Sequence, residues 1–327
     1  MSDCLVVGGG IIGLMSARVL AMSGADVVLL EQNACGKQSS WAAGGILSPL
    51  YPWHYDDEIN ALSFESQAIY QQLCADLLGS TGIDPEYQKT GLLMLDEFGS
   101  PSAKAWLKKY QINFQKQPPG ALFADIATVR NPRLLQALRA DISNKKVQIF
   151  ENIQAENLLI KGKKLLGINT SAGEFLADNI IICAGAWSSK LLDLPEPIFP
   201  IKGQMISLKA KPDAVKHIIL ENGKYIIPRA DGQILIGSTM ENVGFNSAVD
   251  EATKQNLYDF VLRHFPSLKT AKIQHHWSGF RPATKSGKVM IKRDKNYHNL
   301  FINTGHFRNG LSLAPASANR VLGLINE

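Results

Sequence analysis

The stretch Leu5-Val6-Val7-Gly8-Gly9-Gly10-Ile11-Ile12-Gly13, near the start of the chain, decides the fold. A short apolar run meets three glycines in the G-x-G-x-x-G spacing, and a helical pattern of apolar residues follows directly. We therefore predict a strand, a tight turn and a helix. In such a unit Gly8 allows the turn, Gly10 lets a pyrophosphate approach the backbone, and Gly13 lets helix and strand pack closely. The N–H groups at the start of the helix would then face the phosphates.

A second apolar run, Val27-Val28-Leu29-Leu30, ends at Glu31, which lies eighteen residues after Gly13. A dinucleotide-binding fold has at this distance the acid that accepts a hydrogen bond from a ribose hydroxyl. A glycine-rich structural turn is the alternative interpretation of the glycines alone. The strand, the helix, the second strand and the acid together favour dinucleotide binding.

The length and composition are those of a globular protein with one large domain or two domains. The chain has 327 residues, of which 45% are hydrophobic and 19% are charged. The net charge is +5 and the basic residues are spread along the chain, which favours small anionic ligands and no nucleic-acid partner. We find neither a signal peptide nor an apolar window of about eighteen residues, so we expect a cytoplasmic protein with no membrane partner.

The four cysteines predict small core residues in a reducing compartment. Cys4, Cys35, Cys74 and Cys183 form no C-x-x-C pair and no metal-ligand spacing. Cys4 and Cys183 fall inside apolar, strand-like runs. We therefore expect neither disulfides nor a metal site.

A segment rich in small residues, from Gly36 to Ile46, follows Glu31. It contains too much glycine for a strong helix and too many apolar residues for an ordinary surface loop. Either a ligand approaches its backbone or it is a flexible linker. Its position just after the ribose acid favours a ligand.

The rest of the chain contains two kinds of strand pattern, one typical of parallel sheets and one typical of antiparallel sheets. The run from Asn179 to Trp187 predicts a strand buried on both faces, as in a parallel sheet. Between Pro200 and Gly237 the pattern is antiparallel, with turn signals at Asn222-Gly223 and Asp231-Gly232. Asn131-Pro132 predicts a capped helix start with Pro at the first position. We predict an α/β protein in which a Rossmann-like domain (1–80, 131–200 and 285–327) is interleaved with an antiparallel-sheet domain (81–130 and 201–284).

Several separate stretches resemble one family. Besides the first turn and Glu31, they are Ser39-Ser40-Trp41-Ala42-Ala43-Gly44-Gly45-Ile46, Ile182-Cys183-Ala184-Gly185-Ala186-Trp187, Tyr225-Ile226-Ile227-Pro228-Arg229, Gly237-Ser238-Thr239-Met240, Gly279-Phe280-Arg281-Pro282 and Gly305-His306-Phe307-Arg308-Asn309-Gly310. The chain resembles the FAD-dependent D-amino acid oxidase superfamily and, within it, the glycine oxidases of thiamine biosynthesis. The likeness covers nearly the whole chain and is weakest between Glu97 and Gln148.

The resemblance implies FAD, bound non-covalently, and an α/β fold of the D-amino acid oxidase type in which the Rossmann-like domain binds FAD and the antiparallel domain binds substrate. Ser39 and Ser40 would contact the ribityl-pyrophosphate region, Ile153 the adenine side, and the run from His306 to Ser312 the pyrimidine end of the flavin. An ordinary loop with a helix cap is the alternative for that last run. The implied cofactor-binding residues are Gly8, Gly10, Ile11, Ile12, Gly13, Glu31, Gln32, Ser39, Ser40, Gly44, Gly45, Ile46, Ile153, Ala184, Gly185, Trp187, His306, Phe307, Arg308, Asn309, Gly310, Leu311 and Ser312.

For the substrate, the resemblance implies that Arg281 holds a carboxylate through two parallel hydrogen bonds, with the Tyr225 hydroxyl as a further donor. Arg308 would lie beside the substrate, and Met240 and Ile46 would limit the room for a side chain. The alternatives are that Arg281 pairs with a local acid and that Tyr225 packs as a sheet residue. We interpret His306 as a loop hydrogen-bonding residue and not as a base.

The implied reaction is oxidative deamination of glycine, and also of sarcosine and short D-amino acids, to a 2-oxo acid, ammonia and hydrogen peroxide. The product from glycine is glyoxylate, and the glycine imine would supply the thiazole of thiamine. No catalytic side chain beyond the flavin is required. Two alternatives stay open: a D-amino acid dehydrogenase that reduces a quinone, and a non-catalytic flavin subunit of an assembly. We expect a homo-oligomer that takes an amino acid and oxygen as its partners.

Overall fold

Two sheets of eight strands each organise the chain, as a computed structural model that describes residues 2–162 and 164–327 shows. The first sheet has the order β15-β16-β9-β1-β2-β6, with β7 and β8 continuing from β9. Its strands are β1 (Ser2–Val7), β2 (Val27–Glu31), β6 (Gln148–Glu151), β7 (Ala155–Lys161), β8 (Lys164–Thr170), β9 (Gly173–Ile182), β15 (Met290–Arg293) and β16 (Leu300–Thr304). The five strands from β16 to β6 are parallel, and Val6 of β1 lies between Leu29 and Ile181.

The second sheet is antiparallel except for the pair β11 and β3, and its order is β14-β10-β13-β12-β11-β3-β5-β4. Its strands are β3 (Leu92–Met94), β4 (Gln115–Gln117), β5 (Gly120–Phe123), β10 (Phe199–Lys209), β11 (Ile218–Glu221), β12 (Lys224–Pro228), β13 (Gln233–Gly237) and β14 (Ile273–Ala283). The predicted turn Asn222-Gly223 joins β11 to β12, with positive φ at both residues (49° and 72°) as a tight hairpin requires.

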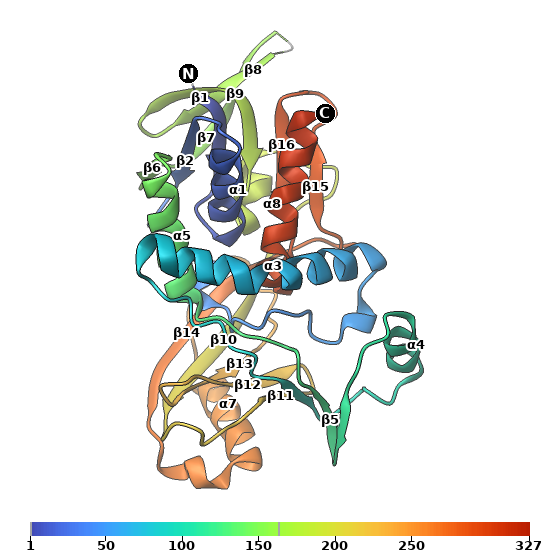
Figure 1. Cartoon of the computed structure of the whole chain (residues 1–327). Helices are drawn as coiled ribbons and strands as arrows, with labels where there is room; N and C mark the ends of the chain where they lie inside the picture. Colours follow the sequence, from blue (N-terminus) through green and yellow to red (C-terminus); the bar gives the residue numbers. More distant parts are fainter. Residues whose placement is uncertain (1, 163) are drawn as a thin grey trace.

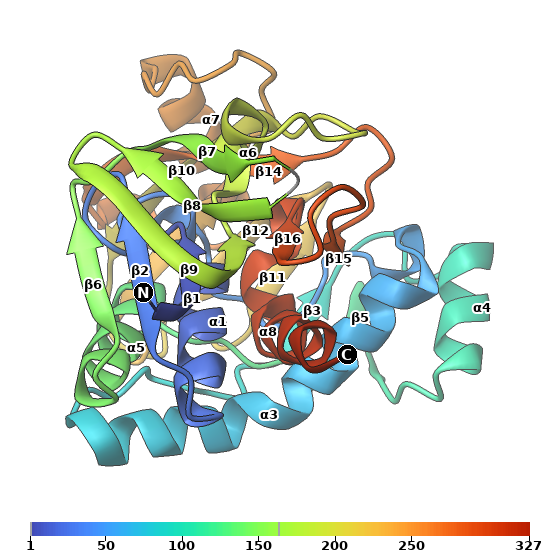
Figure 2. The same cartoon turned by 90° about the horizontal axis from the view of Figure 1, so that it is seen from above.

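Different helices pack against each of the two sheets (Figures 1 and 2). In Figure 1, α1 and α8 lie beside the first sheet, α3 crosses the middle of the molecule, and α7 lies below the second sheet. The helices are α1 (Ile11–Met22), α2 (Ser39–Ala42), α3 (Asp57–Thr81), α4 (Pro101–Lys109), α5 (Asn131–Asn144), α6 (Ser188–Leu191), α7 (Glu251–His264) and α8 (Gly310–Asn326), with short 3-10 turns at Pro52–His54 (η1), Gly185–Trp187 (η2), Pro266–Thr270 (η3) and Phe307–Asn309 (η4).

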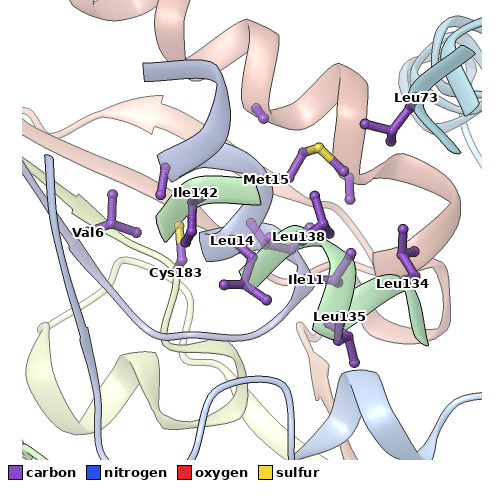
Figure 3. Close-up of a cluster of buried hydrophobic side chains, with 14 of the residues drawn as sticks. Val6, Ile11, Leu14, Met15, Leu73, Leu134, Leu135, Leu138, Ile142 and Cys183 are labelled. Carbon is purple, nitrogen blue, oxygen red and sulfur yellow. The ribbon is translucent and has the colours of Figure 1, made fainter. Parts of the chain in front are cut away.

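The core of the first sheet packs around α1. Leu14 and Met15 of α1 meet Leu138 of α5, and Val6 and Cys183 close the cluster from the sheet (Figure 3). Close approach of β1 and α1 depends on a glycine, because a Cβ at Gly13 would lie 1.8 Å from the carbonyl oxygen of Gly8. Gly13 therefore has the packing role that its place in the motif predicts.

The start of α5 differs from the sequence-based expectation. Asn131 is already helical and does not cap the helix, although Pro132 does lie in the first turn. The buried Asn131 amide instead donates to the carbonyl oxygens of Ser40 (3.1 Å) and Ala43 (2.6 Å). The Asn131 side chain therefore anchors the small-residue segment to this helix end, and its Oδ1, the atom that a cap would use to accept a helix N–H, has no partner in the described residues.

The four cysteines are buried and free, as predicted for core residues. In the described residues, no helix is both long and apolar enough to span a membrane. The same residues contain no group of three or more His, Cys, Asp or Glu side chains arranged to hold a metal ion.

Candidate active site

A cavity of about 380 Å³ lies where the two sheets meet. The carboxyl ends of β1, β2, β9 and β16 open into it, as do the first residues of α1 and α8. On the side of the second sheet it is bounded by residues of β10, β12 and β14. Parallel α/β sheets bind ligands at the carboxyl ends of their strands, so this is the expected place for a site.

One end of the cavity is made mainly of backbone. Gly8, Gly10, Ile11 and Ile12 line it, as the glycine motif predicts. Gly8 has φ +110°, and a Cβ there would lie 2.5 Å from the carbonyl oxygen of Cys183, so no other residue fits. The first helical N–H of α1, at Ile11, donates to the Ser40 hydroxyl (2.9 Å). This end thus presents helix N–H groups and a hydroxyl, which suit phosphate oxygens.

Glu31 lies at the end of β2 and lines the same part of the cavity. Its carboxylate accepts hydrogen bonds from the backbone N–H of Gly9 (2.7 Å) and of Asn33 (2.9 Å). Burial raises the pKa of Glu31, and these hydrogen bonds oppose the effect. Each carboxylate oxygen has further lone pairs with which to accept a ribose hydroxyl. Gln32 and Ile153 line the cavity beside it.

The small-residue segment crosses from the first sheet to the second. The Ser39 hydroxyl donates to the carbonyl of Phe280, and Trp277 donates from Nε1 to the carbonyl of Ala42 (3.0 Å). A Cβ at Gly279 would lie 2.6 Å from that of Ala42, so β14 and α2 touch at this glycine. The segment is therefore fixed in place and is not a flexible linker.

Gly44 and Gly45 then line the middle of the cavity together with Ile46. A Cβ at Gly45, where φ is +81°, would lie 2.1 Å from the carbonyl oxygen of Val129. At Gly44 a Cβ would lie 2.6 Å from Ile227. Bare backbone therefore faces the cavity here, which suits the close approach of a flat ring.

Arg281 on β14 lines the other end. Its guanidinium donates to the carbonyl oxygens of Thr239 (3.0 Å) and Lys202 (3.4 Å) and to the Ser238 hydroxyl (2.6 Å). Among the described residues it makes no ion pair with a carboxylate, so a local acid is not its partner. Burial lowers the pKa of Arg281. The Tyr225 side chain also interacts with this guanidinium and opposes this lowering of its pKa, and the N–H groups that these contacts leave can donate to a ligand.

Arg308 reaches the same end from the turn before α8. It donates to the carbonyl oxygen of Gly223 (3.1 Å), and its positive charge also lowers the pKa of Arg281. Two cations therefore lie close together here, and neither is paired with an acid in the described part of the chain. A ligand with a carboxylate would relieve this repulsion.

Tyr225 on β12 lies between these cations and the small-residue segment. Its ring packs where a Cβ at Gly44 would come within 3.2 Å and one at Gly237 within 2.9 Å. Its hydroxyl lies 3.6 Å from the sulfur of Met205. Tyr225 is thus both a buried sheet residue and part of the cavity wall.

The turn before α8 brings further predicted residues to the cavity wall. His306, Phe307, Gly310 and Leu311 line it, together with Ala184, Gly185 and Trp187 from the end of β9. His306 is hydrogen-bonded from Nε2 to the Ser317 hydroxyl (3.0 Å), and burial lowers its pKa to about 3. It is therefore neutral and held by a hydrogen bond, in keeping with our interpretation of a loop hydrogen-bonding residue.

Four predicted site residues do not line the cavity. Gly13 packs against β1, and Asn309 and Ser312 are buried and hydrogen-bonded to each other (3.0 Å). Met240 is 61% exposed, and its sulfur lies 4.0 Å from Nη1 of Arg308, which does line the cavity. The expectation that Met240 limits the room for a substrate side chain is not supported, because the chain after β13 turns this side chain toward solvent.

Sequence reasoning missed other residues of the wall, among them Gly203, Met205, Lys190, Asn303 and Thr304. Gly203 matters most, because a Cβ there would lie 2.2 Å from Nη2 of Arg281. The guanidinium therefore lies flat across β10 at its one bare position. A lone glycine inside a strand signals such a close approach, but the partner cannot be known without the strand register.

The cavity fits the FAD that the sequence implies. Gly8, Gly44 and Gly45 line it with bare backbone, and a Cβ at any of them would clash with protein atoms, so these positions of the wall favour glycine. The start of α1 supplies N–H donors for a diphosphate, Glu31 an acceptor for a ribose, and Asn303 a buried carbonyl oxygen with no partner in the described residues. These groups match the two halves of a dinucleotide.

The comparisons with known proteins agree with this geometry. The family model described as "FAD dependent oxidoreductase" (DAO) matches residues 3–322. A glycine oxidase from Pseudomonas aeruginosa is 38% identical over 98% of this chain and 94% of its own length. A bifunctional ThiO/ThiG protein from Nostoc sp. is 32% identical over 99% of this chain, which spans 53% of that longer protein. The crystal structure of a glycine oxidase from Bacillus cereus matches with a TM-score of 0.92 at 26% identity, over 100% of this chain and 95% of that one. The chain belongs to the DAO family of FAD-dependent oxidoreductases.

Proposed function

We propose that this chain is an FAD-dependent glycine oxidase. One observation carries the proposal: Arg281 and Arg308 converge on one end of the cavity, beside the bare backbone of Gly44 and Gly45, and neither has a carboxylate partner among residues 2–162 and 164–327. A small amino acid brings the carboxylate that these cations lack. The relatives named glycine oxidase, at 38% identity, support the same substrate.

The reaction balances with water and oxygen. Glycine loses two electrons and two protons to become an imine, and water converts the imine to glyoxylate and ammonia. When bound, FAD would supply the acceptor for the hydride that leaves carbon and the route by which the two electrons reach oxygen, giving hydrogen peroxide.

The residues of this chain provide orientation. We propose that the guanidinium of Arg281 binds the substrate carboxylate in a paired geometry that fixes the direction of the Cα–H bond. Arg308 adds charge from the other side, and the Tyr225 hydroxyl is a third donor. No side-chain base is needed, and His306 does not serve as one, because it is buried and its pKa is about 3.

The cavity wall at Gly44 and Ile46 sets the room for a substrate side chain in this proposal, which favours glycine, sarcosine and short D-amino acids. A steady-state peroxide assay with glycine, sarcosine, D-alanine and D-proline tests it. We expect peroxide in proportion to glycine consumed. Reduction of the flavin by substrate without peroxide formation would instead support a quinone-linked dehydrogenase, and no reduction at all a non-catalytic flavin subunit.

The expected division of the chain also stays a proposal: an FAD-binding region (1–80, 131–200 and 285–327) and a substrate-binding region (81–130 and 201–284). The strand composition supports it, because every strand of the first sheet falls in the first set of ranges. All strands of the second sheet fall in the second set except for the first two residues of β10. Separate expression of either set would be expected to fail, because α2 joins both.

We further propose that the protein is a cytoplasmic homo-oligomer with no nucleic-acid partner. Its role in the cell would be to supply the glycine imine from which the thiazole of thiamine is made. Four free thiols support the reducing compartment. Exposed apolar side chains at Val243, Phe245 and Val249 support a contact between subunits. The ThiO/ThiG relatives, in which a similar chain is joined to a second protein, support the pathway. Light scattering of the purified holoenzyme measures its mass.

A further inference from the structure

Arg229 is a buried cation that the proposed reaction does not use. It follows β12 directly and is 6% exposed. Its Nη2 donates to the carbonyl oxygen of Gly44 (2.9 Å), and its Nε has no partner in the described residues. Buried polar groups without a hydrogen-bond partner are rare in proteins, so the unpaired Nε–H of Arg229 calls for a physical explanation.

Arg229 makes no ion pair with an acid within the part of the chain that the structure describes. The charges of Glu86 and Asp231 act on it from a distance, but both carboxylates are paired with Arg130, at 3.1 Å and 2.9 Å. Burial lowers the pKa of Arg229 to about 10, the like charge of Arg130 adds to this effect, and the charges of Glu86 and Asp231 oppose it. The group is therefore still protonated at neutral pH, so the fold carries a buried positive charge with no acid in direct contact in the described residues.

The guanidinium lies directly behind the cavity wall. Gly44 and Gly45 line the cavity, and a Cβ at Gly45 would lie 2.9 Å from Nη2 of Arg229. Arg229 itself is not part of the wall, in contrast to Arg281 and Arg308. Its charge thus faces the middle of the cavity across a single layer of backbone, where little water screens it.

We propose that Arg229 is a positioning residue that holds the Gly44 carbonyl and whose charge, acting across Gly44 and Gly45, stabilises the negative charge that FAD gains on reduction. The inference rests on the proposed function, in which substrate delivers a hydride, that is, two electrons and one proton. The cofactor then holds one more negative charge than before. This charge would lie across one layer of backbone from Arg229, which makes no ion pair in the described residues, so reduced FAD would bind more tightly than oxidised FAD.

The test measures the reduction potential of the bound cofactor in the holoenzyme, by anaerobic titration against a reference dye. Arg229→Gln keeps a donor for Gly44 without the charge, and Arg229→Lys keeps the charge without the planar fork. Arg18→Met is the matched control, because Arg18 is a buried arginine that is paired with Asp141 (2.9 Å) and does not line the cavity. FAD content and thermal unfolding confirm that each variant is folded.

We expect Arg229→Gln to lower the equilibrium constant for two-electron reduction at least tenfold, or about 30 mV. Arg229→Lys and Arg18→Met should stay within about threefold of the wild type. An unchanged potential in Arg229→Gln, or an equal loss in Arg18→Met, would overturn the inference. If Arg229→Gln does not fold, the reduction potential of FAD bound to the wild-type protein is compared with that of free FAD. A bound potential above that of free FAD supports the inference, and one no higher than that of free FAD contradicts it, because the protein would then not stabilise the reduced cofactor. Glycine-dependent peroxide formation tests the proposed function separately, because the enzyme could form peroxide, or fail to form it, whatever the reduction potential of its bound FAD.

Discussion

Backbone groups form most of one end of the cavity, and charged side chains form most of the other. At the cofactor end the wall consists mainly of backbone N–H groups and glycines, and the one carboxylate, that of Glu31, accepts hydrogen bonds from two backbone N–H groups. At the substrate end, charged side chains from two distant segments converge, and Arg281 is held by carbonyl oxygens and a hydroxyl of neighbouring strands. The first end is nearly all local backbone geometry, whereas the second depends on strand register.

This difference predicts how each end fails. Where backbone shapes a site, an added Cβ removes the ligand's place and the loss is complete. Where side chains shape it, removal of one donor weakens binding by a finite free energy and leaves the others in place.

The largest effect is expected at the cofactor end, from Gly10→Val. A Cβ at Gly10 meets only the Ser40 hydroxyl, at 3.3 Å, so the fold tolerates the change, whereas the added methyl groups enter the cavity at the start of α1. We expect loss of bound FAD and of the yellow colour, measured by absorbance and by FAD titration. Gly79→Val, in α3 with nothing within 4 Å, is the control. Full FAD occupancy in Gly10→Val would show that this turn does not hold the cofactor.

Arg281→Ala should come next. Loss of a charged hydrogen-bonding partner costs about 1.5–3 kcal/mol, so we expect the KM for glycine to rise tenfold or more while FAD stays bound. Arg320→Ala serves as the control, because Arg320 lies on α8 and pairs with the exposed Glu65 (3.5 Å). Steady-state kinetics with glycine decide the matter, and an unchanged KM would remove Arg281 from the substrate site.

Gly203→Ala adds a Cβ to bare backbone at the substrate end of the cavity. The new Cβ would lie 2.2 Å from Nη2 of Arg281, so the guanidinium must move away from β10. We expect the KM for glycine to rise about threefold to tenfold, less than in Arg281→Ala because the charge remains. Gly323→Ala, near the end of α8 in open space, is the matched control. Equal kinetics in the two variants would mean that Arg281 acts from another position.

The smallest effect concerns His306, and it is measured as a change in stability with pH. Burial lowers the pKa of His306 from 6.5 to about 3, so between these values the unfolded chain binds a proton that the folded chain does not. This contribution to stability is therefore present above pH 6.5 and is lost as the pH falls toward 3. His306→Gln should reduce the loss of unfolding free energy between pH 7 and pH 4.5, measured with urea.

The exposed His298 supplies the control for that measurement. His298→Gln should keep the wild-type dependence on pH. If His306→Gln lost as much stability on acidification as the wild type, the histidine would not be the buried neutral group described here.

The sequence by itself determined the cofactor end and the alternation of the two sheets. The glycine motif, Glu31 and the apolar strands act over a few neighbouring residues, so their spacing along the chain is their spacing in space. Gly13 and the turn Asn222-Gly223 have the geometry that the pattern predicts.

Only the tertiary structure decided which side chains meet across the cavity. Asn131 bonds to the small-residue segment instead of its own helix, Met240 turns to solvent, and Gly203 makes room for Arg281. Arg229 is a buried charge only because β12 ends behind Gly44. Each of these contacts joins residues more than thirty positions apart or depends on the path of a loop, and a one-residue change of register would exchange the faces of a strand. The order of residues along the chain does not contain that register, because it is set by the packing of the whole sheet.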